Sequence, residues 1–169
     1  MVIGVGNSYR HDDGAGPEVA RRVRLVAPPA VAVYEHDGDP ADLLDFWEGA
    51  SLAVVVDAVH THLAVPGEVY RVEVGGGAAS FGPVATTASS HGLGPGDAVA
   101  LARALDRLPA RVVLYGIEGA TFERGVGLSP EVVAAVDRVV TDVMRELRGG
   151  ASLPDQPRRV EDRSDGPSY

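Results

Sequence analysis

The chain has 169 residues, of which 45% are hydrophobic, and its 24 acidic and 15 basic side chains give a formal net charge of −9. This composition predicts one globular domain, and the acidic surface argues against nucleic acid as a partner. Cysteine is absent and every basic residue is arginine, which excludes thiolate nucleophiles, iron–sulfur clusters, thiolate zinc sites and lysine Schiff bases.

Strand and helix patterns alternate along the first half of the chain. Helix starts are marked by acidic residues, and Asp39 followed by Pro40 is typical of an N-cap and first helical position. The run LAVVV is apolar throughout, as expected of a strand covered on both faces. In chain order we predict a strand over residues 1–5, a helix over about 13–24, a strand over 30–34, a helix from 39 to about 49 that buries Leu43, Leu44 and Trp47, and a strand over 52–56.

The second half opens with a segment, residues 68–74, whose polar and apolar side chains alternate. This alternation predicts an edge strand that runs antiparallel and has one face in water. A long loop rich in glycine, alanine, serine and threonine follows over residues 75–94, and loops of this length are usually functional or disordered. We then predict a helix over about 95–106, a strand over 111–117, and a final amphipathic helix with Ser129 as its N-cap that ends near Gly149.

This order of elements predicts a single three-layer α/β/α domain over residues 1–148. Its sheet would be twisted, mainly parallel but mixed, and built from about five strands. Residues 149–169 are polar and proline-rich, so we expect a disordered tail. The first residues lack the basic lead and apolar core of a signal peptide, and no apolar run approaches the ~18 residues of a membrane span. We therefore expect a cytoplasmic protein without membrane contact.

Ligands of parallel α/β domains bind at the carboxyl ends of the strands, and this rule selects the candidate site residues. The glycine-rich turn after the first strand is not a nucleotide fingerprint, because its third glycine position is Tyr9. Asp12 and Asp13, at the entrance of the following helix, would also repel a phosphate. Carboxylates at a helix N-terminus stabilise the helix through its dipole. For Asp12, this structural interpretation and a functional one are equally open.

Three side chains from separate segments are expected to converge at this edge. Asp13 follows the first strand, Asp57 follows the apolar strand, and His91 lies in the long loop. Two carboxylates and one imidazole can bind nickel, zinc, manganese or iron, and three protein ligands leave coordination positions open for chemistry. The sequence therefore predicts a catalytic metal site.

Other constellations are weaker. His60 and His62 form an HTH segment that is either a polar loop or a source of auxiliary metal ligands. Ser89 and Ser90 directly precede His91, but adjacent residues rarely form a triad, and no G-x-S-x-G elbow occurs in the chain.

These residues carry a family resemblance. The segments GVGNSYRHDDGAG at 4–16, VVVDAV at 54–59 with a following Pro-Gly, SSHGLG at 89–94, the strand that ends in Gly-Ile-Glu at 118, and LSP at 128–130 occur in order. Together they resemble the hydrogenase maturation proteases, endopeptidases that trim the C-terminus of the large subunit of nickel–iron hydrogenases. The resemblance covers about residues 1–148, and the opening GxGNxxRxDDGxG pattern is its most specific part.

The resemblance implies an α/β/α monomer that engages nickel already inserted in the precursor of a hydrogenase large subunit. The family's metal ligands fall on Asp13, Asp57 and His91, and Gly6 and Asn7 would shape the turn beside the metal. Asp12 would orient a ligand or the first helical turn. Many members carry a DGGTxG-like segment where this chain has His36, Asp37, Gly38 and Asp39, so this stretch is a candidate for precursor selection and leaves the hydrogenase subgroup open.

Two rival functions fit the same side chains. A self-sufficient metallohydrolase would hold its own metal and cleave small amides or phosphoesters. A non-enzymatic nickel-handling module would bind nickel tightly and leave its partner's mass unchanged.

Overall fold

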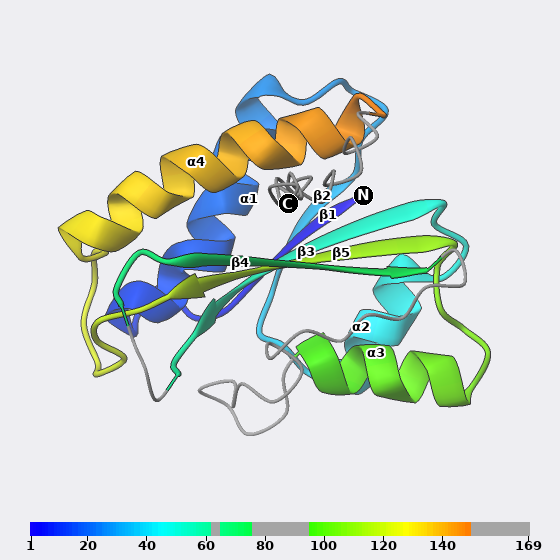
Figure 1. Cartoon of the computed structure of the whole chain (residues 1–169), viewed down its shortest axis with the longest axis horizontal. Helices are drawn as coiled ribbons and strands as arrows, with labels where there is room; N and C mark the ends of the chain where they lie inside the picture. The colour runs from blue at the N-terminus through cyan, green and yellow to red at the C-terminus, as the bar shows by residue number, and fades with distance from the viewer. Residues whose placement is uncertain (62–64, 76–94, 150–169) are drawn as a thin grey trace, which may run out of the picture.

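The computed structural model describes residues 1–61, 65–75 and 95–149, which form a five-stranded sheet between two helical layers (Figure 1). The strand order is β2-β1-β3-β5-β4, with four parallel strands and an antiparallel edge strand, β4, beside β5. The mixed sheet and its antiparallel edge are as predicted. The strands are β1 Val2–Val5, β2 Val33–His36, β3 Leu52–Val59, β4 Val69–Gly75 and β5 Arg111–Glu118.

The helices divide between the two faces of the sheet. In Figure 1, α1 and α4 lie on one side of the strands, and α2 and α3 lie on the other. Each side has its own buried hydrophobic cluster, so the three-layer prediction is confirmed. The helical segments are a 3-10 helix η1 His11–Gly14, α1 Ala15–Val26, α2 Pro40–Trp47, α3 Pro95–Ala104 and α4 Pro130–Leu147.

The central strand β3 shows why an unbroken apolar sequence was needed. Val54 and Val56 pack into the cluster under α1 and α4, whereas Ala53 and Val55 pack into the cluster over α2 and α3. Side chains of a strand alternate between faces, and here helices cover both. Each fully buried valine stabilises the fold by about 1.5–3 kcal/mol relative to exposure. The predicted burial of Leu43, Leu44 and Trp47 in α2 is also confirmed.

Several predicted boundaries were wrong. The first helix begins as the 3-10 turn η1 and becomes α-helical only at Ala15, so Asp13 lies in the 3-10 turn. The second strand starts three residues later than predicted, at Val33, because residues before it form a turn in which the Val31 N–H donates to the Pro28 carbonyl. The strand β3 continues to Val59 because its last residues pair with β5, which places Asp57 inside the strand rather than after it.

Two helices were predicted to have side-chain N-caps, and only one of them does. Asp39 caps α2 as predicted, since its Oδ1 accepts the Ala41 N–H at 2.8 Å. Ser129 stands at the N-cap position of α4, but its side chain makes no capping hydrogen bond. Its backbone N–H instead donates to the Asp12 carboxylate. None of the helices in the described residues is long and apolar enough to cross a membrane.

Candidate functional site

The turn after β1 aims Asp13 at the carboxyl end of the sheet. Gly6 has φ of +132°, and a Cβ there would come within 1.9 Å of the Asp13 carbonyl oxygen, so only glycine fits. Asn7 then forms an Asx turn, with its Oδ1 accepting the Tyr9 N–H at 2.9 Å. The Asn7 N–H donates to Asp13 Oδ2 at 3.1 Å. The turn residues predicted beside the site therefore hold the Asp13 carboxylate directly.

Asp12, the neighbouring carboxylate, acts as a structural clamp. It is fully buried, and its Oδ2 accepts the N–H groups of Ala120 and Thr121 at 2.8 and 3.1 Å. Its Oδ1 accepts the Ser129 N–H at 2.6 Å. These bonds tie η1 to the loop between β5 and α4, more than 100 positions away in the sequence. Asp12 therefore fixes the loop and the start of α4, and with all these N–H donors on its oxygens it is a positioning residue.

Asp57 is the reverse case, a buried carboxylate without a hydrogen bond. The residue is only 4% exposed, and neither carboxylate oxygen has a hydrogen-bond partner in the described part of the chain. Burial, reinforced by the nearby negative charge of Asp13, raises the pKa of Asp57 to about 8. The Ala58 N–H opposes this pKa shift more weakly, and its geometry falls short of a hydrogen bond. A cation bound between Asp13 and Asp57 would relieve both effects.

Unpartnered polar atoms gather around Asp57. Six buried side-chain polar atoms in the described residues lack a hydrogen-bond partner, and four of them lie on Asp57, Thr61 and Glu118, just after or near the ends of β3 and β5. Glu118 is fully buried; its Oε1 accepts the Thr61 N–H at 2.8 Å, while its Oε2 has no partner. Sequence reasoning missed Glu118 as a site residue. It is an acidic residue at the end of a largely apolar strand, the same signal that selected Asp57.

The histidines predicted near the site are only partly described. His60 Nδ1 lies 3.7 Å from Glu118 Oε1, its side chain is 62% exposed, and its ring packs edge-on against Phe122 with centroids 5.7 Å apart. His62 and His91 lie outside the described residues. Within those residues no group of three His, Asp or Glu side chains is arranged to hold a metal ion. Asp13 and Asp57 are thus the two predicted metal ligands that the structure describes.

The segment predicted to select the precursor forms the turn between β2 and α2. His36 Nδ1 accepts the Gly38 N–H at 2.9 Å, and Gly38 has φ of +98°. The His36 ring packs edge-on against Phe46, 5.1 Å between centroids, and Asp37 is exposed. Asp39 caps α2. His36, Gly38 and Asp39 therefore have local structural roles, and the role of this segment in selection stays a prediction.

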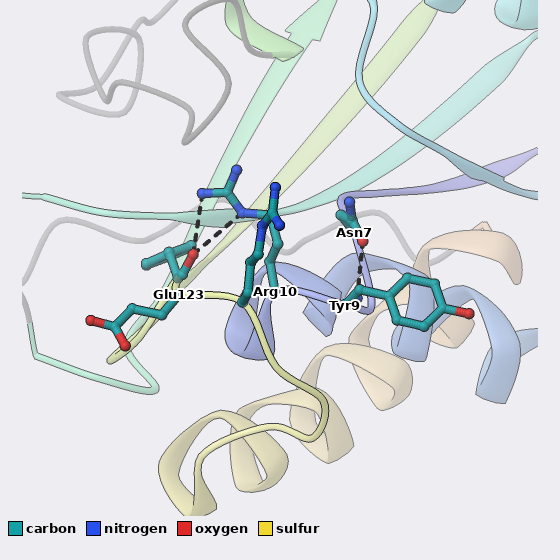
Figure 2. A pocket seen from close by; sticks show the side chains of 6 residues that line it. Asn7, Tyr9, Arg10 and Glu123 are labelled. Atoms are coloured by element: carbon teal, nitrogen blue, oxygen red, sulfur yellow. Dashed lines mark hydrogen bonds between the residues drawn. The ribbon is translucent and has the colours of Figure 1, made fainter.

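A cavity of about 870 Å³ opens beside the η1 turn. It is lined by Asn7, Tyr9, Arg10, Phe122, Glu123 and Arg124. Figure 2 shows Arg10 held across this space, because its Nε and Nη2 donate to the Phe122 carbonyl oxygen at 3.3 and 3.1 Å. Asn7 also holds Asp13, and Phe122 also contacts His60. Two of the residues that line the cavity therefore also contact predicted site residues, Asp13 and His60.

Comparison with known proteins identifies consistent relatives. The profile of the family described as "HycI: Hydrogenase maturation protease" matches residues 18–146. The hydrogenase expression/formation protein HupD of Rhodobacter capsulatus is 31% identical over 88% of this chain and 70% of its own length. The hydrogenase 2 maturation protease of Escherichia coli is 24% identical over 88% of this chain and 90% of its own length. The solved structure of the E. coli hydrogenase maturating endopeptidase HybD shares the fold, with a TM-score of 0.69, 23% identity and coverage of 89% and 92% of the two chains.

Proposed function

Because the chain belongs to the hydrogenase maturation protease family, we propose that it is an endopeptidase that removes a C-terminal peptide from the precursor of a nickel–iron hydrogenase large subunit. The single observation that carries the site assignment is Asp57. A fully desolvated carboxylate without a partner, next to a second carboxylate, destabilises the fold unless a ligand compensates it. The ligand that compensates two adjacent carboxylates is a cation.

In this proposal the nickel arrives as part of the substrate. Asp13, Asp57 and His91 complete the coordination of nickel that the precursor holds with its own cysteines, and the absence of cysteine from this chain is consistent with that division. The metal, once shared, supplies Lewis-acid chemistry that polarises the scissile carbonyl or a water molecule. Coordination also fixes the cleaved segment against the enzyme, which makes nickel a condition for docking.

The remaining residues of the site position these ligands. The Asn7 N–H holds Oδ2 of Asp13 and so fixes the orientation of that carboxylate. Asp12 keeps η1 and the loop before α4 in fixed relation. We further propose that residues 36–39 contribute to precursor selection, that His60 and His62 are auxiliary ligands at most, and that the enzyme acts as a monomer.

The test compares nickel-loaded with nickel-free precursor. The enzyme is incubated with purified large-subunit precursor in each of the two forms, and the intact mass of the precursor is followed over time. We expect loss of a short C-terminal peptide from the nickel-loaded form only. Equal cleavage of the nickel-free precursor would contradict the metal-dependent mechanism. An unchanged precursor mass together with turnover of small amides would favour the small-substrate metallohydrolase, and tight nickel binding without any cleavage would favour a nickel-handling module.

A further inference from the structure

Glu118 shares one face of the sheet with Asp57. In the β3–β5 register Asp57 pairs with Gly116 and Val59 pairs with Glu118. Residues two apart in a strand point to the same face, so the side chains of Asp57 and Glu118 both lie on the side of α2 and α3. The strand spacing and the rise of two residues place their Cβ atoms roughly 8 Å apart. Within the described residues Glu118 is not grouped with Asp13 and Asp57 as ligands of one metal, and the separation is close to the length of two residues of an extended peptide.

The Glu118 carboxylate keeps one oxygen that accepts no hydrogen bond from a described residue. Glu118 is fully buried and uses Oε1 to hold the Thr61 N–H, whereas Oε2 and the Thr61 hydroxyl have no partner in the described residues. No arginine among the described residues forms an ion pair with Glu118; its recorded ion-pair neighbour is His60, 3.7 Å from Oε1. The group found next to Glu118 is therefore itself a nitrogen base.

His60 lies between the solvent and the buried Glu118 carboxylate, since its largely exposed ring is 3.7 Å from Oε1. The His60 side chain is largely exposed and forms no hydrogen bond with a described residue, and its ring rests against Phe122, which also lines the cavity beside the η1 turn. A cationic group that enters along Phe122 can take the place of the imidazole and donate to the carboxylate. The buried Asp13 carboxylate at the same edge of the sheet adds to the negative potential that attracts such a group.

We propose that Glu118 and Thr61 form a subsite that binds a basic side chain of the precursor's C-terminal segment, about two residues from the part held at Asp57. This inference rests on the proposed function and deepens it, because it assigns a substrate feature to residues outside the metal site. Glu118 is then a binding residue, so its loss raises KM more than it lowers kcat.

The first arm of the experiment changes the enzyme. In Glu118→Gln the amide oxygen keeps the Thr61 N–H, and an NH2 group replaces Oε2 and repels an incoming donor. Cleavage of nickel-loaded precursor is measured by intact mass at several precursor concentrations. We expect KM to rise roughly 10- to 100-fold with kcat within about threefold, as for loss of a charge-assisted hydrogen bond. The matched control is Glu68→Gln, which removes the same charge from an exposed side chain in the same region and should leave KM unchanged. Thr61→Val, which removes only the hydroxyl, should give a smaller rise in KM.

The second arm changes the precursor and needs no enzyme variant. Each basic residue of the precursor's C-terminal segment is replaced by glutamine in turn. We expect one replacement to raise KM for the parent enzyme and to add nothing to the effect of Glu118→Gln. The subsite is refuted if no replacement changes KM, or if folded Glu118→Gln and Thr61→Val both process the unmodified precursor like the parent. Failure of the parent to cleave the unmodified precursor would instead refute the proposed function, and the subsite with it.

Discussion

Two buried carboxylates on opposite faces of the sheet have opposite surroundings. Glu146 of α4 accepts from Arg71 Nε at 2.9 Å, Arg111 Nη2 at 2.7 Å and the Tyr115 hydroxyl at 3.3 Å, all on β4 and β5. Asp57, at the carboxyl end of β3, has no partner on either oxygen among the described residues. The first carboxylate stabilises the link between α4 and the sheet edge, whereas the second is a cost that the fold tolerates.

The number of hydrogen-bond donors on each carboxylate separates structural from functional acids in this molecule. Asp12 and Glu146 are buried with donors on both oxygens, and each joins segments far apart in the chain. Asp57 and Glu118 are buried with at least one oxygen empty. Burial alone does not distinguish the two kinds, since all these side chains are nearly inaccessible. The number of hydrogen-bond donors to each carboxylate distinguishes them.

The largest expected effect is a loss of processing activity when the charge of Asp57 is removed. Asp57→Asn keeps the size of the side chain but removes the charge that would bind the precursor's nickel, so processing should fall at least about 100-fold. The readout is the intact mass of a co-expressed hydrogenase large subunit, with circular dichroism to show that the variant folds. Glu146→Gln is the control, because it alters the other buried carboxylate and should process precursor like the parent at 25 °C. Normal processing by Asp57→Asn would remove Asp57 from the site.

The next effect concerns the stability that the hydrogen bonds to Glu146 provide. Glu146→Gln removes the charge that two arginines share, and these arginines are about 30% exposed, so water compensates part of the loss. We expect the free energy of unfolding to fall by about 1–2 kcal/mol. Urea denaturation monitored by circular dichroism measures it. An unchanged midpoint would mean that this network contributes nothing to the fold.

An effect of the opposite sign is expected at Asp57. The folded-state pKa of Asp57 is raised to about 8, so the stability of the parent protein falls as pH rises from about 4 to about 8. Asp57→Asn lacks this dependence. In the presence of a chelator, we expect the variant to be several kcal/mol more stable than the parent at pH 9, with the difference vanishing near pH 4. Urea denaturation series at both pH values test this, and a variant less stable at pH 9 would contradict it.

The smallest effect concerns Glu73, the half-buried acid of the Arg71 and Arg111 network. Hydrogen bonds from Arg111 and then Arg71 lower the pKa of Glu73 to about 2. A lowered pKa means that its stabilisation is present above about pH 4.5 and is lost as pH falls toward 2. Because the side chain is 37% exposed, we expect Glu73→Gln to cost less than ~1 kcal/mol at pH 7 and nothing near pH 2. Thermal unfolding at several pH values measures the difference, which should not grow on acidification.

Part of the site was predictable because its signals are local. The apolar run before Asp57, the glycine and asparagine of the first turn, and the alternation of residues 68–74 correctly indicated a covered central strand, a tight turn and an antiparallel edge. The acid at the end of β5, Glu118, carried the same local signal as Asp57 but was not predicted as a site residue. His91 remains a predicted ligand outside the described residues.

The sequence by itself determined which segments become strands and helices and that acidic residues lie at the carboxyl end of the sheet, because periodicity and burial are written within a few neighbouring residues. It also predicted Asp13 as the metal ligand and gave Asp12 an orienting role, although the two are adjacent and chemically identical. Only the tertiary structure shows how Asp12 is held, since the amides that donate to it come from residues 108 to 117 positions further along the chain. Which backbone donors reach a carboxylate depends on segments distant in the sequence, and only the assembled fold places them.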